Sequence, residues 1–403
     1  MILLDLSKLI QEITGRQESL FRDDLYNATD KLAEGIEGTS VLVIGGAGTI
    51  GSQFIKALLP YRPARLYVAD ISENGLTELV RDLRSMPGLY IPEAFRTYPV
   101  SYSSPVFRKI LQKEGPFDTV ANFAAHKHVR SEKDAYSAEA MLRNNVLEAI
   151  GLMDMLTEQP PGRFFCLSTD KAADPVNIMG ASKKLMEGVA LSYAGRFHVA
   201  SARFSNVLFS TGSLPAGVME RLSKGQPLAA PQDIRRYFIS PEESGQLCLL
   251  ACFLSRNRDI FYPVMDRRKD MVTFTAIAER LLARVHYTPD YCRTDVEAIE
   301  KARGRSADDP HYPVYFFPSN TTGEKPEEVF YSANEMRDEG RFASLGVIRD
   351  SQADSVDTGR LQSELENLFS GNDYDKKDIV YLLSQYIPGF DHQDKGRHLD
   401  ESI

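Results

Sequence analysis

The sequence lacks any uninterrupted apolar run of the ~20 residues that a membrane-spanning helix needs. Its first residues, MILLDLSKLIQEITGRQESLF, also lack the basic start of a secretory signal, and their short apolar opening leads directly into a charged helical pattern. We therefore expect a protein with neither a membrane span nor a secretory signal.

Positive charge is in short supply, because the formal net charge at pH 7 is -9. A broad surface for nucleic acid needs clustered Lys and Arg, so this charge argues against nucleic acid as a partner. A local basic pocket for one diphosphate is still compatible with it.

Cysteine is scarce as well, with four in 403 residues. Cys166 lies in an apolar, strand-like run, and Cys248 and Cys252 lie one helical turn apart among leucines. This placement favours buried free thiols over disulfides or a metal site. Together with the missing signal and span, it predicts a cytoplasmic protein.

The composition that remains is that of an ordinary globular protein, with 43% hydrophobic and 26% charged residues. Residues 1–38 have the amphipathic helical pattern of an arm that packs on its own domain or on a neighbouring subunit. We expect a main domain over 39–207, a smaller lobe over 208–349 and a polar, acidic helical tail over 350–403.

Short apolar strands alternate with helices across the main domain. Strands that are apolar on both faces are typical of a parallel sheet with helices on either side, so we expect a doubly wound α/β fold. The lobe, with helices at 241–254 and 274–285 and a strand at 312–317, should form a mixed α/β unit over the carboxyl edge of the sheet. The expected strands are 41–44, 65–70, 117–125, 162–169 and 198–204, and the expected helices are 52–59, 74–84, 134–156 and 179–193.

A glycine-rich turn follows the first strand and opens a helix, with the spacing G-x-x-G-x-x-G. Glycine allows a tight turn and a close approach to a pyrophosphate, which the helix N-terminus attracts. Asp70 ends the next strand, where a carboxylate can bind ribose hydroxyls and repel the extra phosphate of NADP, so NAD is favoured over NADP. A tight turn without any ligand is the alternative interpretation of the glycine spacing. The cofactor-binding candidates of this turn are Gly45, Gly48, Thr49, Ile50 and Gly51.

A second polar cluster ends the strand at 162–169. Thr169, Asp170 and Lys171 bring a hydroxyl, an acid and an amine to the sheet edge where ligands bind in such folds. These residues alone would also fit a solvated loop. A helix beginning near Met179 then carries Lys183.

Together these features resemble the extended short-chain dehydrogenases/reductases, and more closely the bacterial UDP-N-acetylglucosamine 4,6-dehydratases of polysaccharide and glycan synthesis. The resemblance extends over residues 12–390, and we expect a soluble form without the membrane domain of the large members. The stretches that carry it are TGR at 14–16, AAHKHV at 124–129, STDKAADPVNIMGASK at 168–183, RFSNVL at 203–208, RYF at 236–238 and TGEK at 322–325.

The resemblance implies a redox-neutral reaction. Bound NAD takes hydride from carbon 4 of the sugar, water leaves across carbons 5 and 6, and hydride returns to carbon 6. By position, Asp170 would protonate the departing hydroxyl and Lys171 would be the base at carbon 5. Thr169 would hydrogen-bond the oxygen at carbon 4, and Lys183 would hold the nicotinamide ribose. The base role requires a lowered pKa of Lys171, a shift that Asp170 opposes.

Several positions depart from the family pattern. Met179 stands where most short-chain dehydrogenases have Tyr, which leaves the deprotonation at carbon 4 to Asp170, acting through Thr169 or a water. Many members of the dehydratase family share this Met. Ser205 replaces a common Gly, and the strand near 98–101 lacks the Asp used at the adenine edge.

The resemblance also assigns further contacts. Ala124 and Ala125 would lie beside the cofactor, and Asn145 would support the loop at the end of the strand expected at 117–125. His126 and His128 form a His-x-His pair without a third ligand, so we expect no metal. The expected substrate-binding residues are His128, Asn206, Arg236 and Lys325.

Two other functions stay open. A nucleotide-sugar 4-epimerase or reductase shares this fold but usually relies on the Tyr that is missing here. A non-catalytic NAD-bound regulatory subunit would explain Met179, whereas Asp170 and Lys171 argue against it. We expect a UDP-sugar substrate and a homo-oligomer.

Overall fold

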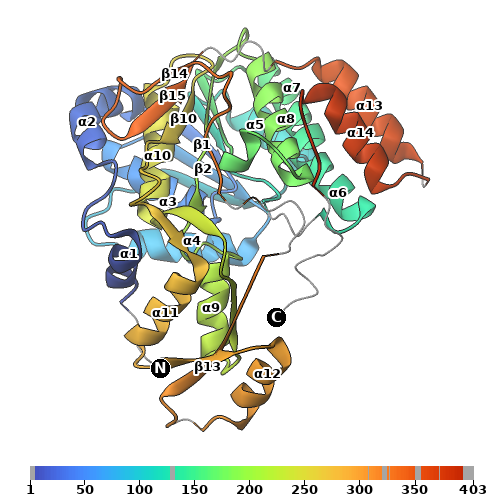
Figure 1. The fold of residues 1–403 in the computed structure, drawn as a ribbon. Coiled ribbons are helices and arrows are strands. Elements are labelled where there is room, and N and C mark those ends of the chain that lie inside the picture. The colour runs from blue at the N-terminus through green and yellow to red at the C-terminus, as the bar shows by residue number, and fades with distance from the viewer. Residues whose placement is uncertain are drawn as a thin grey trace.

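The computed structural model describes residues 5–127, 132–306, 308–319, 325, 327–349, 355–371 and 373–393. Its centre is one large sheet that runs through the upper part of the molecule (Figure 1). Within the described residues, no helix combines the length and the apolar character needed to cross a membrane.

The large sheet has the strand order β14-β15-β10-β6-β5-β4-β1-β2-β3. All neighbours from β10 to β3 are parallel, and β14 and β15 add an antiparallel edge. The strands are β1 (Ser40–Ile44), β2 (Arg65–Asp70), β3 (Ala94–Pro99), β4 (Thr119–Asn122), β5 (Arg163–Leu167), β6 (His198–Ala202), β10 (Ile260–Pro263), β14 (Arg337–Asp338) and β15 (Leu345–Ile348).

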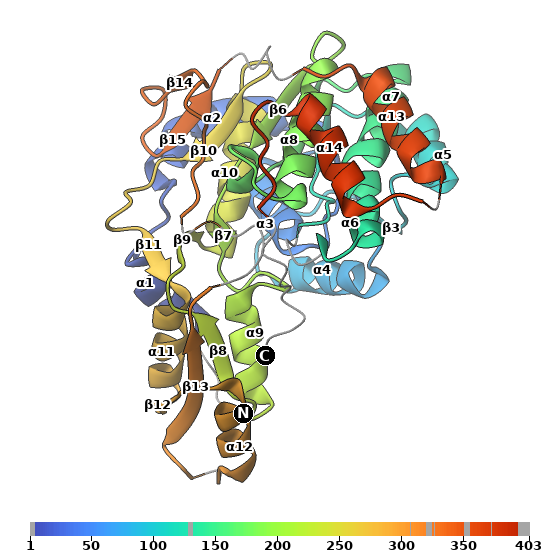
Figure 2. The ribbon, with the colours of Figure 1, turned by 45° about the vertical axis from the view of Figure 1, so that its right-hand side comes forward.

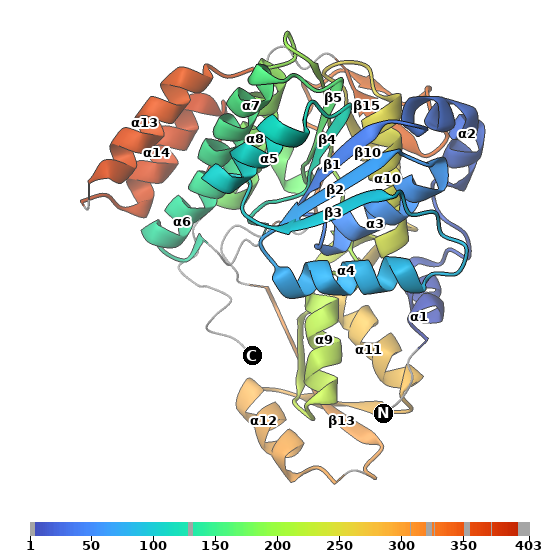
Figure 3. The ribbon, with the colours of Figure 1, turned by 180° about the vertical axis from the view of Figure 1, so that it is seen from behind.

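Helices cover both faces of this sheet, which confirms the doubly wound fold (Figure 3). In β1, Leu42 and Ile44 join one hydrophobic core and Val41 and Val43 join the other, because alternate side chains of a strand point to opposite faces. One face carries α2 (Arg22–Ile36), α3 (Thr49–Leu58), α4 (Glu73–Ser85) and α10 (Pro241–Leu254), and the other carries α5 (Pro105–Glu114), α6 (Ala135–Leu142), α7 (Glu148–Glu158) and α8 (Ile178–Ser192).

Two expected elements differ from the structure. The strand expected at 117–125 is only β4, Thr119–Asn122, because the chain leaves the sheet there to line a cavity. The helix expected at 134–156 is interrupted by a π-helical turn, η3 (Arg143–Leu147). Such a turn widens the helix locally and is common near functional sites.

The N-terminal arm packs on its own chain. Its first helix, α1 (Leu6–Thr14), buries Leu9 and Ile13 in the core of the lobe, against α11 (Phe274–Arg284). Arg16 then donates two hydrogen bonds to Glu243, at 3.0 and 2.8 Å. The arm is thereby fixed to the first turn of α10.

The lobe lies below the large sheet (Figure 2). Its parallel sheet has the order β12-β13-β8, and a further small sheet has the order β11-β9-β7. The sequence analysis missed α9 and α12, whose apolar faces are short. The lobe contains β7 (Asn206–Val207), α9 (Leu214–Ser223), β8 (Leu228–Pro231), β9 (Arg235–Ile239), β11 (Met271–Thr273), β12 (Thr288–Cys292), α12 (Asp295–Gly304) and β13 (His311–Phe317).

Two C-terminal helices, α13 (Thr358–Ser370) and α14 (Lys376–Tyr386), pack beside α6 and α8 (Figure 1). Both confirm helical patterns of the tail. The range 208–349 contributes β10, β14 and β15 to the large sheet, so the lobe is interleaved with it. The chain divisions at 38, 207 and 349 stay predictions.

Candidate active site

A cavity of about 430 Å³ lies at the carboxyl ends of β1, β2, β4, β5 and β6. The strand order reverses between β1 and β4, and such a reversal leaves a crevice in which open α/β sheets bind ligands. Every predicted catalytic residue and every predicted cofactor-binding residue lines this cavity: Gly45, Gly48, Thr49, Ile50, Gly51, Asp70, Ala124, Ala125, Thr169, Asp170, Lys171, Met179 and Lys183.

The glycine turn forms one wall of the cavity. Gly45 has φ +74°, and a Cβ there would lie 2.6 Å from the backbone nitrogen of Ala124. A Cβ on Gly51 would lie 2.4 Å from the carbonyl oxygen of Gly45. Gly48 precedes the first turn of α3, whose N-cap makes no side-chain hydrogen bond in the described chain. The amides of that turn are therefore available to an anion in the cavity.

Asp70 lies at the end of β2 and holds the glycine turn. Its carboxylate accepts hydrogen bonds from the backbone nitrogens of Ala47, at 3.0 Å, and Ser72, at 2.9 Å. The sequence analysis did not foresee this support. The ribose contact expected of Asp70 stays a prediction.

Thr169, Asp170 and Lys171 form one hydrogen-bonded group after β5. Asp170 is buried, and its Oδ1 accepts from the Thr169 hydroxyl at 2.8 Å and from Lys171 Nζ at 3.0 Å. The backbone nitrogen of Asp170 donates to the carbonyl of Phe204, which fixes this turn to the end of β6. An acid and an amine are therefore joined by a hydrogen bond inside the cavity.

The base role of Lys171 requires a lowered pKa, and the surroundings of Lys171 give the opposite shift. Burial lowers the pKa of Lys171, but the charges of Asp170 and Glu328 together raise it more, and the net pKa is raised. The Nζ of Lys171 lies 3.9 Å from Oε1 of Glu328, a buried carboxylate that the sequence analysis overlooked. The structure therefore holds Lys171 as an ammonium.

Met179 and Lys183 come from the first turns of α8. Met179 is buried, and its backbone nitrogen donates to Glu132. Lys183 Nζ donates to the carbonyl of Leu167 at 2.6 Å, beneath the site. Burial lowers the pKa of Lys183 to about 8.

Asn145 supports the loop after β4, as the sequence analysis expected. Its side chain accepts from the backbone nitrogen of His126 at 2.8 Å and donates to the His126 carbonyl at 2.9 Å. It also donates to the Ser182 hydroxyl at 2.9 Å. The π-helical turn places Asn145 between this loop and α8.

Of the predicted substrate residues, Asn206 lines the cavity and His128 lies outside the described residues. Arg236 and Lys325 lie together near it, because Arg236 Nη2 donates to the Lys325 carbonyl at 2.8 Å. Lys325 Nζ also donates to the Asp174 carbonyl and lies 3.8 Å from Oε2 of Glu328. These two cations are thus joined to the segment that carries the catalytic candidates.

Four buried polar atoms of the cavity wall have no hydrogen-bond partner among the described residues. Such atoms are costly unless a ligand or water pairs with them. The sequence pointed to one of these residues, Ser205, because the family commonly has Gly at this position. Nothing in the sequence pointed to Ser168. The atoms are Ser168 Oγ, Asp170 Oδ2, Ser205 Oγ and Asn206 Nδ2.

The four cysteines are free and buried, as expected. Burial raises the pKa of the Cys166 thiol to about 11. In the described part of the chain, no three His, Cys, Asp or Glu side chains are grouped so that they could hold a metal ion.

Several known proteins are similar to this chain in sequence. An uncharacterized membrane protein of Methanocaldococcus jannaschii is 33% identical over 259 residues, which are 62% of this chain and 74% of that protein. A probable polysaccharide biosynthesis protein of Bacillus subtilis, EpsC, is 27% identical over 68% of this chain, but only 45% of its own length is matched. A UDP-N-acetylglucosamine 4,6-dehydratase (inverting) of Campylobacter jejuni is 26% identical over 62% of this chain and 73% of its own. Other matched relatives are named UDP-glucose 4-epimerase.

Solved structures share the fold. Pen from Bacillus thuringiensis aligns with a TM-score of 0.62 and 18% identity, over 82% of this chain and 98% of its own. DesIV, a dTDP-glucose 4,6-dehydratase of Streptomyces venezuelae solved with NAD bound, aligns with a TM-score of 0.53 and 20% identity, over 73% of this chain and 87% of its own. The sequence profile of the family described as polysaccharide biosynthesis protein matches residues 41–306, more than half of the chain. The chain therefore belongs to this family, and it has the Rossmann fold of the extended short-chain dehydrogenases/reductases.

Proposed function

We propose that the protein is an NAD-dependent 4,6-dehydratase of a UDP-N-acetylhexosamine, with UDP-N-acetylglucosamine as the first candidate substrate. The observation that carries the proposal is the buried contact of 3.0 Å between Asp170 and Lys171 in the cavity. Hydride transfer alone does not need such a pair, whereas the elimination of water needs both an acid and a base. The named 4,6-dehydratase among the relatives supports the proposal.

The cavity fits NAD in shape and chemistry. Gly45 and Gly51 let the turn pack closely against backbone at the cavity wall, and the start of α3 offers amides to the charge of a pyrophosphate. Asp70 at the end of β2 favours NAD over NADP because a carboxylate repels a phosphate. When bound, NAD supplies the hydride acceptor and donor of the reaction. DesIV was solved with NAD, and it has the same fold.

The protein's own side chains then position the sugar and move protons. Thr169 presents a hydroxyl at the cavity wall, next to the Asp170 carboxylate. The buried amine of Lys183 lies beneath this wall, and its positive charge favours negative charge that develops above it. We assign the hydrogen bond to the oxygen at carbon 4 to Thr169 and the nicotinamide ribose to Lys183.

The acid and the base arise from one proton transfer. In the structure Lys171 is the donor and Asp170 the acceptor of their hydrogen bond, which is the reverse of the forms that the elimination needs. Transfer of one proton from Lys171 Nζ to Asp170 breaks an N–H bond and forms an O–H bond. It yields a neutral amine, the base at carbon 5, and a carboxylic acid that protonates the hydroxyl leaving carbon 6.

The substrate's nucleotide is assigned to the lobe side of the cavity. Arg236 and Lys325 are cations suited to a diphosphate, and the amide nitrogen of Asn206 on the cavity wall has no partner within the described ranges. His128 completes the predicted set. Met179 carries no proton, and Asp170 cannot take a second proton while it holds that of Lys171, so we assign the proton of the carbon-4 hydroxyl to water, reached through Thr169.

The test is to incubate purified protein with UDP-N-acetylglucosamine, without added cofactor, and to follow the sugar by mass spectrometry. We expect loss of the mass of one water, and we expect Lys171→Ala to abolish it. Solvent deuterium at carbon 5, read by NMR, then gives the stereochemistry.

An epimerase is the second candidate, because relatives of that name match the chain. It would give an isomer of unchanged mass in the same experiment. A sugar unchanged across a panel of UDP-sugars, with NAD added, would refute both enzymes and favour a binding subunit.

A further inference from the structure

A second carboxylate reaches Lys171 from the segment that follows β13. Glu328 is only 3% exposed. Its Oε1 lies 3.9 Å from Lys171 Nζ, and its Oε2 lies 3.8 Å from Lys325 Nζ. Oε2 has no hydrogen-bond partner among the described residues. An acid in this position is unusual, because buried carboxylates are costly unless cations compensate them.

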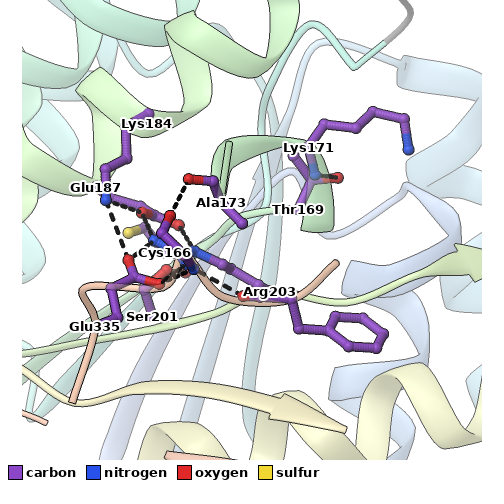
Figure 4. Close-up of polar contacts among 11 residues, drawn as sticks. Cys166, Thr169, Lys171, Ala173, Lys184, Glu187, Ser201, Arg203 and Glu335 are labelled. Carbon is purple, nitrogen blue, oxygen red and sulfur yellow. Dashed lines mark hydrogen bonds and ion pairs between the residues drawn. The ribbon is translucent and has the colours of Figure 1, made fainter. Parts of the chain in front are cut away.

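The segment that carries Glu328 is fixed by a buried arginine cluster, which consists of Arg203, Glu187 and Glu335 (Figure 4). Arg203 is fully buried and donates to both carboxylates at 2.7 to 2.8 Å. It also donates to the Phe330 carbonyl at 3.2 Å, two residues after Glu328. Arg203 follows β6 directly, so the large sheet itself sets where Glu328 lies.

The same segment is joined to the catalytic turn. The Ser332 hydroxyl donates to the carbonyl of Ala173, two residues after Lys171. Lys325 Nζ donates to the carbonyl of Asp174. Contacts of residues before and after Glu328 in the sequence therefore fix the segment that carries it. The position of its carboxylate near Lys171 does not depend on one flexible side chain.

Among the described residues, charged groups from two other parts of the chain and from its own segment face Glu328. Lys171 and Asp170 face it from the turn after β5, Arg236 from β9, and Lys325 from its own segment. Burial raises the pKa of Glu328, and Lys171 opposes this shift. For Lys171, Glu328 is the second negative charge after Asp170.

We propose that Glu328 is a positioning residue of the active site, whose carboxylate acts with Asp170 to hold Lys171 in place as an ammonium and so sets the pH at which the amine becomes neutral. The consequence for catalysis rests on the proposed dehydratase. If one shared proton serves Asp170 and Lys171, turnover falls at high pH, where that proton is lost. Glu328 moves this fall to higher pH because a negative neighbour favours the ammonium.

The test is chemical labelling of Lys171, which needs no turnover. The holoprotein, as purified, is exposed briefly to acetic anhydride at one alkaline pH, and acetylation of Lys171 is compared with that of the exposed Lys8 by mass spectrometry. In Glu328→Gln the neutral amine should be more abundant, so we expect labelling of Lys171 to rise by about tenfold, which corresponds to about one pKa unit. Turnover should also fall off at a lower pH than in the wild type.

Glu327→Gln is the matched control, because Glu327 pairs with Arg235 and Arg267 outside the cavity. It should label like the wild type. Glu328→Asp retains the charge at a greater distance and should give an intermediate increase; it replaces Glu328→Gln if that variant does not fold. Equal labelling of Lys171 in the wild type and the Glu328 variants would overturn the proposal. A labelling change in a protein that dehydrates no sugar would support the role of Glu328 and refute the dehydratase.

Discussion

The contact between Lys171 and Asp170 determines what the site can do at the scale of single residues. Either residue alone at a strand end would be an ordinary polar side chain. At 3.0 Å, and with Asp170 buried, each changes the proton affinity of the other. Neighbouring residues point to opposite sides in an extended strand. The two side chains meet because the chain enters a short 3-10 turn, Asp170–Ala172.

Replacement of Asp170 by Asn should reduce turnover of the UDP-sugar by about 10²- to 10⁴-fold. The amide has nearly the same size, but it can neither take the proton of Lys171 nor protonate the leaving hydroxyl. The rate of water loss, measured by mass spectrometry, checks this. Asp174→Asn is the control, because Asp174 is an exposed acid of the same loop whose side chain is not assigned to the chemistry. Equal rates in the two variants would remove Asp170 from the mechanism.

At the scale of elements, the glycine turn and the loop after β4 fit closely against each other. The turn leaves β1 at Gly45 and passes the backbone of Ala124 without room for a side chain. Asp70 and Asn145 hold the two pieces from opposite sides, through backbone hydrogen bonds. The ends of β4, β1 and β2, which are neighbours in the sheet, therefore form one wall of the cavity.

Gly45→Ala should destabilise the protein by about 1–3 kcal/mol and weaken its hold on NAD, since the new Cβ meets Ala124 and the backbone has a positive φ. Unfolding in urea and the NAD content of the purified protein are the measurements. Gly48→Ala is the matched control for stability in the same turn, with an ordinary φ of -71° and no atom nearer than 3.4 Å to the added Cβ. A Gly45 variant as stable as the Gly48 variant would contradict this account.

At the scale of the whole molecule, segments from both ends of the chain complete the cores. The N-terminal arm buries Leu9 in the lobe and Leu32 against the large sheet. The C-terminal helices bury Leu365 and Leu383 in the core that also contains β1 residues. The homo-oligomer and the cytoplasmic location stay predictions.

Leu383→Ala should lower the free energy of unfolding by about 2–5 kcal/mol, because it leaves a cavity in the core shared with α6 and α8. Urea unfolding followed by circular dichroism measures it, and a single shifted transition is expected if the tail folds with the main sheet. Tyr381→Ala, on the same helix but 69% exposed, should change stability by less than about 0.5 kcal/mol. A separate early transition in Leu383→Ala would show instead that the tail unfolds on its own.

The fold and most of the cavity wall could be predicted from the sequence because their signals are local. Apolar strands, the glycine spacing and the residues at strand ends are each read within a few positions, and the parallel sheet then brings the strand ends to one edge. Lys183 could be assigned to the same site for the same reason, as one residue of the helix that follows the strand.

Only the tertiary structure could determine the partners of Lys171. Glu328 lies more than 150 residues after Lys171 in the sequence. The segment that carries Glu328 is held at the site by Arg203, which is fully buried between two carboxylates. No periodicity links such residues, because their approach depends on how the segment after β13 returns to the large sheet. The sequence by itself therefore determined which groups are available for chemistry, Asp170 beside Lys171 included. The charge that Lys171 carries was decided by burial, by the turn that brings Asp170 to its amine and by the distant carboxylate of Glu328, all of which exist only in the folded chain.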